Sequence, residues 1–434
     1  MKLSPPEVIA AALPIVTRLR EHRFEAVFVG GAVRDTVLGL PVKDVDIATS
    51  ALPEQVLALF ERCIPTGLQH GTVTVVHNKI AYEVTTYREE ARYEAHRKPE
   101  SVRYIASLEG DLLRRDFTMN AMALSADGEL IDPYGGLHDL RLGLLRCVGD
   151  PNARFAEDAL RMLRAVRFIG AYGLKPAYRT WRALLRHGHL MKFIAMERVA
   201  SELDKLIAGA SPARGLHYAA ASRLLEHLKE PLPAEVTLAA AEACRTRSTA
   251  ALFAGLGKLK EADLRLASVA IGLSLTSDAA LRSMQALRLS NQRTKSIMGL
   301  LGIHLDLQEA EPDPEEHSLR PAWLGIVLRY GVRMAGQWLE IAELLQRTTP
   351  ARCIVPAAQL EAWMNEMPVA TLKQLKVSGK ELAEHLRKPT GPWISDWLSR
   401  LLLEAALGRV PNDKQPLLRQ AELWDKKEES NDES

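Results

Sequence analysis

Two aspartates in the segment KDVDIAT, Asp44 and Asp46, have the type and spacing that metal chemistry needs. They alternate with Val45 and Ile47, so a strand would direct both carboxylates to one face, about 7 Å apart along the backbone. Like charges this close repel unless cations neutralise them, and two divalent ions bridged by carboxylates form a clamp for phosphoryl chemistry. Mg²⁺, which prefers oxygen ligands and phosphates, is the expected cofactor, with Asp44 and Asp46 as its ligands. The alternative is a solvated turn.

A glycine pair precedes these aspartates. In EAVFVGGAVRDTVLG an apolar strand runs into Gly30 and Gly31 and then into a helix, which lets backbone N–H groups approach a phosphate. The alternative is a tight turn that only needs positive φ. The dinucleotide pattern G-x-G-x-x-G and the P-loop pattern are both absent. Glu83, between apolar neighbours in AYEVTTY, is a candidate third catalytic carboxylate or else an ordinary strand-face glutamate.

The elements that must position these residues change character along the chain. From Glu25 to about Val148, short β-rich runs such as GTVTVV alternate with helical runs such as PEQVLALFER and DFTMNAMAL, which predicts a small mixed α/β domain. After Asp150 apolar residues recur at helical spacing, so the remainder is predicted to be all-helical. We expect an α+β fold with a mixed sheet in a head (1–150), then a helical neck (151–215), body (216–345) and tail (346–434) with a disordered acidic end.

The composition excludes several classes of protein. The chain has 434 residues, 47% hydrophobic and 25% charged, as in ordinary globular proteins of two to four domains. The N-terminal stretch has neither a signal-peptide core nor a spanning segment, so we expect a cytoplasmic protein. Four scattered cysteines, without a C-x-x-C pair, argue against a disulfide framework or a zinc ribbon. A net charge of +2 does not indicate a strongly basic nucleic-acid binder.

Gly-Gly followed by Asp-x-Asp on the next strand resembles the nucleotidyltransferase superfamily that includes DNA polymerase β. The segments RRDFTMNAMA, IDPYGGLHDLRLGLLR and EDALRMLRAVRF extend the resemblance to the class II tRNA nucleotidyltransferases, or CCA-adding enzymes, and to the related bacterial poly(A) polymerases. The resemblance is dense from Phe24 to Gly173 and thin thereafter. It implies a polymerase-β-like head and template-independent addition of nucleotides to RNA.

The segment RFAEDALRMLRAVRF carries Asp158, Arg161, Arg164 and Arg167 at steps of three, as neighbours along one stripe of a helix. A solvated face is the alternative. Asp158 only accepts hydrogen bonds and Arg161 only donates them. Cytosine and adenine each offer an amino donor beside an acceptor, whereas uracil and guanine reverse that order. The pair would therefore accept C and A, as the family's E-D-x-x-R motif implies, while Arg164 and Arg167 face the triphosphate or orient the pair.

Other nucleotide contacts are expected around LLRRDFTMNAM and the glycine turn. The resemblance makes Arg115 a binding residue and Asp116 a candidate for the ribose 2′-hydroxyl, although an aspartate that caps a helix is the alternative. Gly31 and Arg34 would bind the nucleotide, unless Arg34 is a surface arginine. Residues 85–104 are predicted to be a mobile loop, which the family associates with adding the final A. The Gly-Gly turn in IDPYGGLHDL is predicted to be a hinge.

The helical remainder is expected to carry the RNA. Its basic groups would contact phosphates along a long surface: Arg288, Arg293, Lys295, Lys376 and Lys380. Trp393 and Trp397, four residues apart, are expected in a core rather than as stacking platforms for bases. The predicted partners are tRNA, CTP and ATP, with no membrane and no protein partner.

We therefore predict addition of C, C and A to the 3′ end of tRNA from CTP and ATP, with release of pyrophosphate by two-metal catalysis. One alternative is an A-adding enzyme or a poly(A) polymerase of the same family. A second, of another class, is a catalytically silent tRNA-binding protein. A third is a small-molecule nucleotidyltransferase, which would need neither the Asp158–Arg161 selector nor the long helical remainder.

Overall fold

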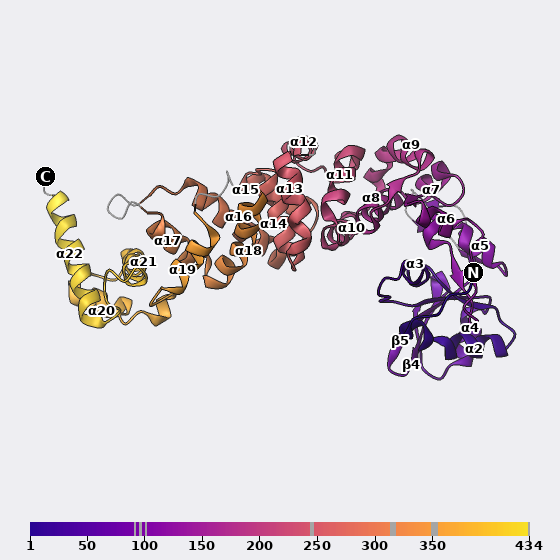
Figure 1. Ribbon diagram of the computed structural model, residues 1–434. Helices are drawn as coiled ribbons and strands as arrows, with labels where there is room; N and C mark the ends of the chain where they lie inside the picture. The colour runs from indigo at the N-terminus through magenta and orange to yellow at the C-terminus, as the bar shows by residue number, and fades with distance from the viewer. Residues whose placement is uncertain are drawn as a thin grey trace. The chain divides into compact units, whose positions relative to one another are not determined.

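A computed structural model of the chain describes residues 1–90, 93–94, 98–99, 102–243, 247–312, 318–348 and 355–432 (Figure 1). The chain divides into two compact units. Unit 1 comprises Met1–Thr237 and Ala286–Arg288, and unit 2 comprises Leu238–Gln285 and Leu289–Ser434. The finer division into head, neck, body and tail stays a prediction. No helix in the described part of the chain combines the length and apolar character that a membrane span needs.

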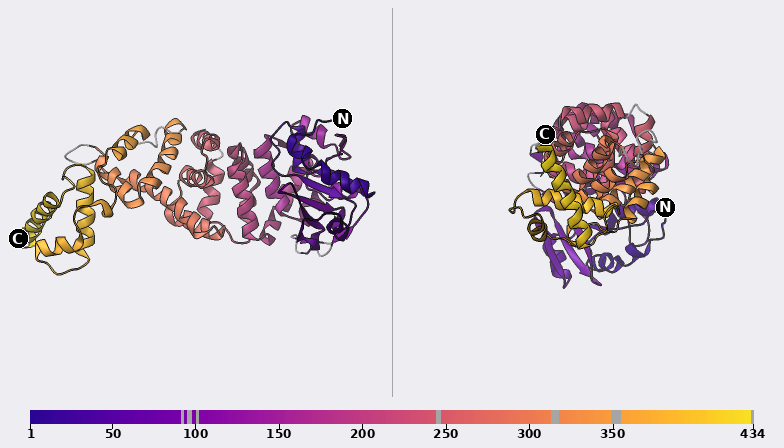
Figure 2. Two further views of the ribbon diagram at one scale, coloured as in Figure 1. Left: turned by 90° about the horizontal axis from the view of Figure 1, so that it is seen from below. Right: turned by 90° about the vertical axis from the view of Figure 1, so that its left-hand side faces the viewer.

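A mixed sheet forms the N-terminal part of unit 1, as predicted. Its strand order is β11-β10-β1-β2-β5-β4-β3, and β2 and β5 run parallel whereas the other neighbours run antiparallel. The strands are β1 (Ala26–Val29), β2 (Asp46–Thr49), β3 (Cys63–Gly67), β4 (Thr72–His77), β5 (Ile80–Thr86), β10 (Ala123–Leu124) and β11 (Leu130–Ile131). Figure 2 shows the sheet in the indigo part of the chain and helices along the part coloured magenta to yellow.

Strand β1 lies inside the sheet, between β10 and β2, and is buried along its whole length. Val27 and Val29 share a core with Ala48 and Ala123 of the flanking strands and with Tyr87. Helix α2 (Leu13–Glu21) packs on β1 through its buried apolar side, while its charged residues lie at the surface. An apolar run of four residues between Glu25 and Gly30 is therefore a core strand because both of its faces are covered.

The remaining helices of the sheet region are short. They are α1 (Glu7–Ala10), α3 (Gly31–Val37), α4 (Pro53–Leu59), α5 (Leu108–Leu113) and α6 (Gly136–Arg141), with 3-10 turns η1 (Leu68–His70) and η2 (Thr118–Asn120).

The predicted helix over DFTMNAMAL is wrong. The structure has the turn η2 followed by strand β10, in which Leu124 pairs with Phe28 and Ala123 pairs with Val29. Every residue from Asp116 to Leu124 is buried. An apolar run that is buried on all sides carries no periodicity that separates helix from strand.

Three two-stranded ladders complete unit 1. Strand β6 (Arg88–Glu90) pairs with β9 (Val102–Tyr104), β7 (Tyr93–Glu94) with β8 (Lys98–Pro99), and β12 (Leu144–Leu145) with β13 (Lys175–Pro176). The segment predicted to be a mobile loop, 85–104, therefore includes paired strands near both of its ends. Its residues 91–92, 95–97 and 100–101 lie outside the described part of the chain.

Helices follow the sheet, as predicted. They are α7 (Pro151–Glu157), α8 (Leu160–Tyr172), α9 (Tyr178–His187), α10 (Met196–Ala208), α11 (Pro212–Ser222) and α12 (Ala234–Ala243), with 3-10 turns η3 (Gly188–Phe193) and η4 (Leu224–His227). Helix α8 packs against α10 and α11 and ends at Gly173, whose φ of +66° closes the helix. Gly170 lets α8 approach α11, because a Cβ atom there would lie 2.9 Å from the Gly215 backbone nitrogen.

The described part of unit 2 is helical. Its elements are α13 (Arg247–Gly255), η5 (Leu256–Lys258), α14 (Ala262–Gly272), α15 (Ser277–Ala286), α16 (Asn291–Glu309), α17 (Arg320–Tyr330), α18 (Val332–Thr348), α19 (Ala357–Asn365), η7 (Leu372–Gln374), α20 (Gly379–Leu386), α21 (Trp393–Ala406) and α22 (Lys414–Asp432). Trp323 is fully buried against Trp338, and its indole N–H donates to the Leu360 carbonyl at 2.8 Å.

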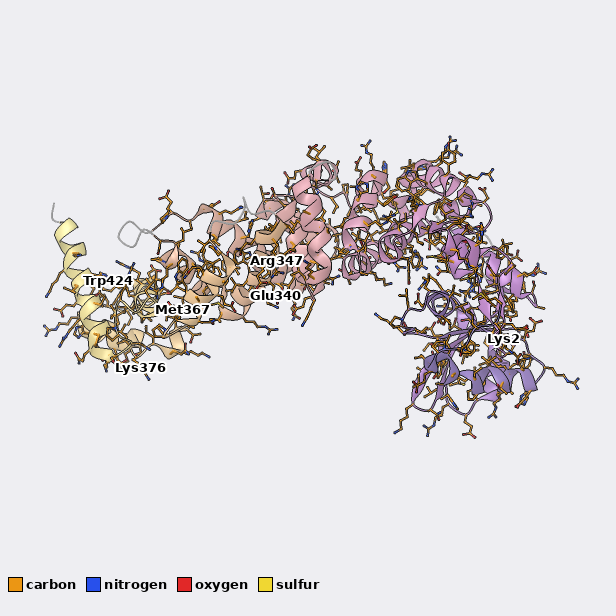
Figure 3. All side chains as sticks on the ribbon, viewed as in Figure 1. Lys2, Glu340, Arg347, Met367, Lys376 and Trp424 are labelled. Atoms are coloured by element: carbon orange, nitrogen blue, oxygen red, sulfur yellow. The ribbon has the colours of Figure 1, made fainter. Side chains whose placement is uncertain are left out.

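The last helices form a core of their own around Trp397, which packs edge-on against Trp393 and Trp424. Trp397 is buried and Trp393 is packed against this core, so the predicted core role of both is confirmed. Trp424 is labelled on α22 in Figure 3, and the Arg400 guanidinium lies 4.3 Å from the centre of its ring.

The disorder predicted for the acidic end stays a prediction, although the described part of that end is helical up to Asp432. Helix α22 continues to that residue, and within it Lys426 and Glu422 form an ion pair at 2.9 Å, one helical turn apart. Lysine and glutamate at this spacing support a helix that is already started, a contribution that composition alone does not reveal. Residues 433–434 lie outside the described part of the chain.

Candidate active site

The turn between β1 and α3 depends on glycine. Gly30 has φ +71° and ψ −134°, and α3 begins at Gly31. A Cβ atom at Gly30 would lie 3.2 Å from Arg115 Nη1 and 3.4 Å from Asp46 Oδ2. Glycine is therefore needed here for its positive φ and also for the space that two charged groups occupy. The interpretation of the glycine pair as a turn that needs positive φ is confirmed at Gly30, whereas the approach of its backbone N–H groups to a phosphate stays a prediction.

Asp46 and Glu83 form a carboxylate edge on the sheet. Asp46 is the first residue of β2 and pairs with Val29 on one side and with Glu83 of β5 on the other. Paired residues of neighbouring strands share a face, so the two carboxylates are neighbours. Burial raises the pKa of the Asp46 carboxyl, Arg115 opposes this, and the charges of Glu83 and Asp44 raise the pKa further. The structure thus brings the candidate third carboxylate, Glu83, next to Asp46.

The prediction that one strand carries both aspartates is wrong, because β2 begins at Asp46. Asp44 lies in the exposed segment before the strand. Opposite this point β1 ends at Val29 and the chain turns at Gly30, so Asp44 has no ladder partner on that side. Its charge nevertheless raises the pKa of Asp46, so both aspartates contribute to the electrostatics of the edge.

The donor set of the edge fits a divalent ion such as Mg²⁺. It consists of carboxylate oxygens, the ligand type that Mg²⁺ and Ca²⁺ prefer. Within the described ranges, no group of three or more His, Cys, Asp or Glu side chains is assembled as a closed metal site. Mg²⁺ usually takes one or two protein carboxylates together with substrate phosphates, so an open edge of this kind suits it.

Arg115 faces this edge and is held by the buried carboxylate of Asp111. Arg115 Nη2 donates to Asp111 Oδ2 at 3.3 Å, and its Nη1 donates to the Asn120 carbonyl at 3.5 Å. Its Nε is buried without a hydrogen-bond partner among the described residues. Burial alone would raise the pKa of Asp111, but the charges of Arg114 and Arg115 outweigh it and lower that pKa. Arg115 therefore presents a donor that lacks a partner near Asp46.

Asp116 is buried between the sheet and helix α8. Its Oδ1 accepts the Phe117 N–H at 2.8 Å and the Asn120 amide at 3.0 Å, while its Oδ2 accepts Arg164 Nε at 2.9 Å. Burial alone would raise the pKa of Asp116, but the charge of Arg164 and these hydrogen bonds lower it to about 2. The alternative role of Asp116 as a helix cap is excluded, because a 3-10 turn and a strand follow it.

Arg34 is buried, so its alternative role as a surface arginine is also excluded. Its guanidinium donates to both oxygens of Asp35 and to Asn120 Oδ1 at 2.6 Å. It lies 4.4 Å from the ring centre of Tyr172, whose hydroxyl donates to Asp35 at 3.1 Å. Arg34 thus ties α3 to η2 and to α8.

Asp158 does not lie on helix α8, because this helix begins at Leu160. The prediction that Asp158 shares one helical stripe with the three arginines is therefore wrong. Asp158 ends α7 in an extended conformation, and its Oδ1 accepts the Leu160 N–H at 3.0 Å. Its Oδ2 accepts Arg198 Nη2 from α10 at 2.8 Å. Two short helices meet at Asp158, so the carboxylate accepts the first N–H of the second helix instead of standing on its face.

The three arginines of the predicted stripe do lie on α8, but each has its own carboxylate partner. Arg161 is buried and donates to Glu157 at 2.6 Å and to the Arg114 carbonyl at 3.0 Å. Arg164 binds Asp116, and Arg167 Nε donates to Glu202 at 2.7 Å. Because each charge is paired, the three arginines do not repel one another as their spacing alone would suggest.

Four residues of this arrangement were missed by sequence reasoning: Asp111, Asn120, Arg198 and Glu202. Arg198 and Glu202 stand four residues apart on α10, so they share a face toward Asp158 and Arg167. Their spacing in MERVASEL was the available signal. Partners forty residues away along the chain are invisible to a local pattern.

The remaining predictions concern the hinge and the basic groups. Gly136 in IDPYGGLHDL is packed closely, since a Cβ atom there would lie 2.2 Å from the Thr118 carbonyl, and the hinge stays a prediction. Arg288 is paired with Glu197 and Glu230. Three of the other basic groups are exposed: Lys295, Lys376 (labelled in Figure 3) and Lys380. Arg293 pairs with Asp263.

The sheet, its glycine turn and its carboxylate edge define a nucleotidyltransferase. Residues 26–146 match the family model described as the poly(A) polymerase head domain. Residues 173–234 match the probable RNA and SrmB-binding site of polymerase A, and residues 258–421 match tRNA nucleotidyltransferase domain 2.

Relatives of known identity match over nearly the whole chain. The CCA-adding enzyme of Geobacillus thermodenitrificans is 37% identical over 95% of this chain and 96% of its own, and that of Geobacillus stearothermophilus is 37% identical over the same shares. The crystal structure of the Bacillus stearothermophilus CCA-adding enzyme in complex with CTP covers 98% of this chain and 100% of its own, with a TM-score of 0.82 and 33% identity. The chain belongs to the CCA-adding enzymes, a family of tRNA nucleotidyltransferases that use a divalent metal ion.

Proposed function

We propose that this chain adds C, C and A to the 3′ end of tRNA from CTP and ATP and releases pyrophosphate. One observation carries the proposal: unit 1 holds both a carboxylate edge and the Asp158 carboxylate, linked by hydrogen bonds around Asp116 and by electrostatic interactions at the two ends. Arg115 donates to the Asn120 carbonyl, the Asn120 amide donates to Asp116, and Arg164 donates to Asp116. The charge of Asp158 in turn acts on Arg164.

The reaction is assigned to the carboxylate edge. Asp44 and Asp46, with Glu83 beside them, would hold Mg²⁺. A Mg²⁺ ion held there would lower the pKa of the attacking tRNA 3′-hydroxyl and would stabilise the charge on the leaving pyrophosphate. The absence of a side chain at Gly30 leaves room for Asp46 and for Nη1 of Arg115 at the place assigned to the nucleotide phosphates. This is the physical role that we assign to the glycine turn, including Gly31 at the start of α3.

The nucleotide is assigned to the network that surrounds Asp116. Arg115 binds the phosphates or the ribose, and Asp116 is the candidate for the ribose 2′-hydroxyl. The negatively charged Asp116 also holds Arg164 in place through an ion pair. Glu202 holds Arg167 in place through a second ion pair. Arg34, which is buried and bound to Asp35, acts by positioning α3 and η2 around the nucleotide.

Base selection is assigned to Asp158 with Arg161. The Asp158 carboxylate is fixed by Arg198 and by the Leu160 N–H. A carboxylate has about four lone-pair positions, so acceptor capacity remains for the amino group of C or A. Arg161, fixed by Glu157, is the donor of the pair. Uracil or guanine would place an acceptor against Asp158 and leave buried polar groups unsatisfied.

The test is the base choice of Asp158→Asn. An amide adds a donor where the carboxylate only accepts, so the preference in kcat/KM for CTP over UTP should fall from at least about 100-fold to within about tenfold. The measurement is single-nucleotide extension of a tRNA transcript that lacks CCA. Asp127→Asn, an exposed aspartate of the sheet region, is the matched control and should keep the wild-type ratio. An unchanged ratio in Asp158→Asn would exclude this carboxylate as the selector.

The alternatives are less well supported. An A-adding enzyme, a poly(A) polymerase and a silent tRNA-binding protein are not favoured, because the curated relatives that match 95% of the chain are CCA-adding enzymes. A small-molecule nucleotidyltransferase would have no use for the later helices, where residues 258–421 match a tRNA nucleotidyltransferase domain.

A further inference from the structure

One buried aromatic ring, that of Phe168, lies against three arginines of unit 1. Phe168 belongs to α8, and 3% of it is exposed. The guanidinium carbon of Arg167 lies 4.0 Å from the centre of the ring, that of Arg164 lies 5.3 Å from it, and that of Arg34 lies 5.4 Å from it. All three lie within the distance of about 6 Å at which a guanidinium is attracted to an aromatic face.

The ring adds a constraint that carboxylates alone do not give. Each guanidinium is bound along its edge by a different carboxylate: Arg34 by Asp35, Arg164 by Asp116, and Arg167 by Glu202. A guanidinium is planar, and a carboxylate at its edge leaves the plane free to tilt about the hydrogen bonds. A ring against the face of the guanidinium restricts that tilt. Phe168 is therefore the residue at which the orientations of the three side chains are set together.

Neighbouring rings hold Phe168 in place. Phe117 packs edge-on against it, with ring centres 5.8 Å apart and ring planes at 83°. Tyr172, one helical turn further along α8, has its ring centre 6.0 Å from that of Phe168 and donates its hydroxyl to Asp35 at 3.1 Å. Burial raises the pKa of Tyr172 to about 12, so the hydroxyl keeps its proton at neutral pH. This packing fixes the ring against which the arginines lie.

Arg164 is the arginine of the three that is most open to a ligand. Its side chain is 33% exposed, compared with 15% for Arg167 and 8% for Arg34. Its Nε and Nη2 bind Asp116, whereas its Nη1 lies 3.9 Å from Glu202, beyond hydrogen-bond length. This nitrogen can therefore donate to an anion, and the tilt of the guanidinium decides where it points.

We propose that Phe168 is a positioning residue for nucleotide binding, and that its ring sets the plane of the Arg164 guanidinium so that Nη1 meets the phosphates of the incoming nucleoside triphosphate. This inference rests on the proposed function, which supplies the nucleotide. It adds to that function a residue that touches no ligand and acts through Arg164. Because the phosphates are common to CTP and ATP, the two nucleotides depend on the ring equally.

The test replaces Phe168 in the full chain by phenylalanine that carries one, two or three fluorine atoms on its ring. Fluorine withdraws electron density from the face of the ring and changes its shape little, so the attraction to a guanidinium weakens stepwise while the packing is kept. The measurement is the Kd of CTP and of ATP, by titration calorimetry with Mg²⁺ and without tRNA. We expect each fluorine to raise both values, and three fluorines to raise them at least about tenfold.

A second variant, Phe168→Leu, removes the ring and keeps an apolar side chain. In tRNA extension it should raise the KM for CTP and for ATP at least about tenfold. The KM for tRNA and the preference for CTP over UTP should be unchanged, because the ring contacts neither Asp158 nor Arg161 among the described residues. If the leucine variant does not fold, the fluorinated series decides.

Phe28 is the matched control. It is fully buried in β1 and pairs with Ile47, so its side chain lies on the face of the sheet opposite to that of Asp46. The same fluorinated residues at Phe28 should leave both Kd values unchanged.

The proposal is overturned if the protein with three fluorines at Phe168 keeps the wild-type Kd for both nucleotides, if fluorination of Phe28 weakens binding equally, or if only one nucleotide is affected. Wild-type protein that binds CTP and ATP with this dependence on the ring but does not extend tRNA would contradict the proposed function and not this inference.

Discussion

Asp116 shows at the scale of one residue how the site is held together. Its carboxylate is buried, yet it accepts from a backbone N–H, from an amide and from the guanidinium of Arg164. Removing one partner of such a buried pair leaves the other charge uncompensated, which is far more destabilising than losing an exposed pair. The residue therefore links nucleotide binding to the stability of unit 1.

This buried pair predicts a particular dependence of stability on pH. The pKa of Asp116 is about 2 in the folded protein and 3.8 as its ordinary value, so the folded state favours the charged form. The stabilisation is present above about pH 4 and is lost as the pH falls through 2, and it amounts to about 2 kcal/mol. Asp116→Asn should lower the free energy of unfolding by about this amount at pH 7, and the gap should close toward pH 2.

The measurement is urea unfolding of wild type and Asp116→Asn at several pH values between 7 and 2. Asp127→Asn serves as the control, since Asp127 pairs with Arg20 at the surface, with 65% of its side chain exposed. Its effect should stay within about 1 kcal/mol at every pH. A gap between wild type and Asp116→Asn that stays constant with pH would show that the stabilisation has another origin.

At the scale of elements, the sequence predicted those features that local patterns determine. The apolar run before Gly30, the mixed sheet and the helical remainder follow from periodicity and glycine placement. The partner of Asp158 could not be predicted from a local pattern, because Arg198 reaches it from another helix, forty residues away along the chain. The segment from Asp116 to Leu124 was predicted as helix because uniform burial removes the periodicity that separates helix from strand.

The turn from β1 to α3 gives an element-scale prediction. Gly30→Ala should slow nucleotide addition at least about tenfold, because the new methyl group meets Arg115 and Asp46, besides adding about 1 to 3 kcal/mol of backbone strain. Gly39→Ala, which follows α3, is the control: Gly39 also has positive φ, at +66°, but a Cβ atom there has nothing within 4 Å. The readouts are the extension rate and the melting temperature. Equal extension rates in the two variants would contradict the role assigned to Gly30, which is to leave space beside Arg115 and Asp46.

At the scale of the whole molecule, a net charge of +2 gives no hint of an RNA partner. The charge is instead arranged locally: acidic at the edge of Asp46 and Glu83, basic on the exposed arginines of helix α9, and largely paired around Asp116 and Asp158. Binding of a polyanion by such a chain depends on patches, which the total charge conceals. The acidic edge could be predicted from two aspartates in one short segment of the sequence.

The central claim is that this chain adds C, C and A in order. The most direct measurement is extension of tRNA transcripts that end before CCA, after C and after CC, each supplied with CTP, ATP, UTP or GTP and Mg²⁺. We expect two C residues and then one A, refusal of U and G, and no product with Asp46→Ala that retains the wild-type melting temperature. A single A added only to the CC-ended transcript, long A tails on any RNA, or no incorporation by the wild-type protein would each contradict the account.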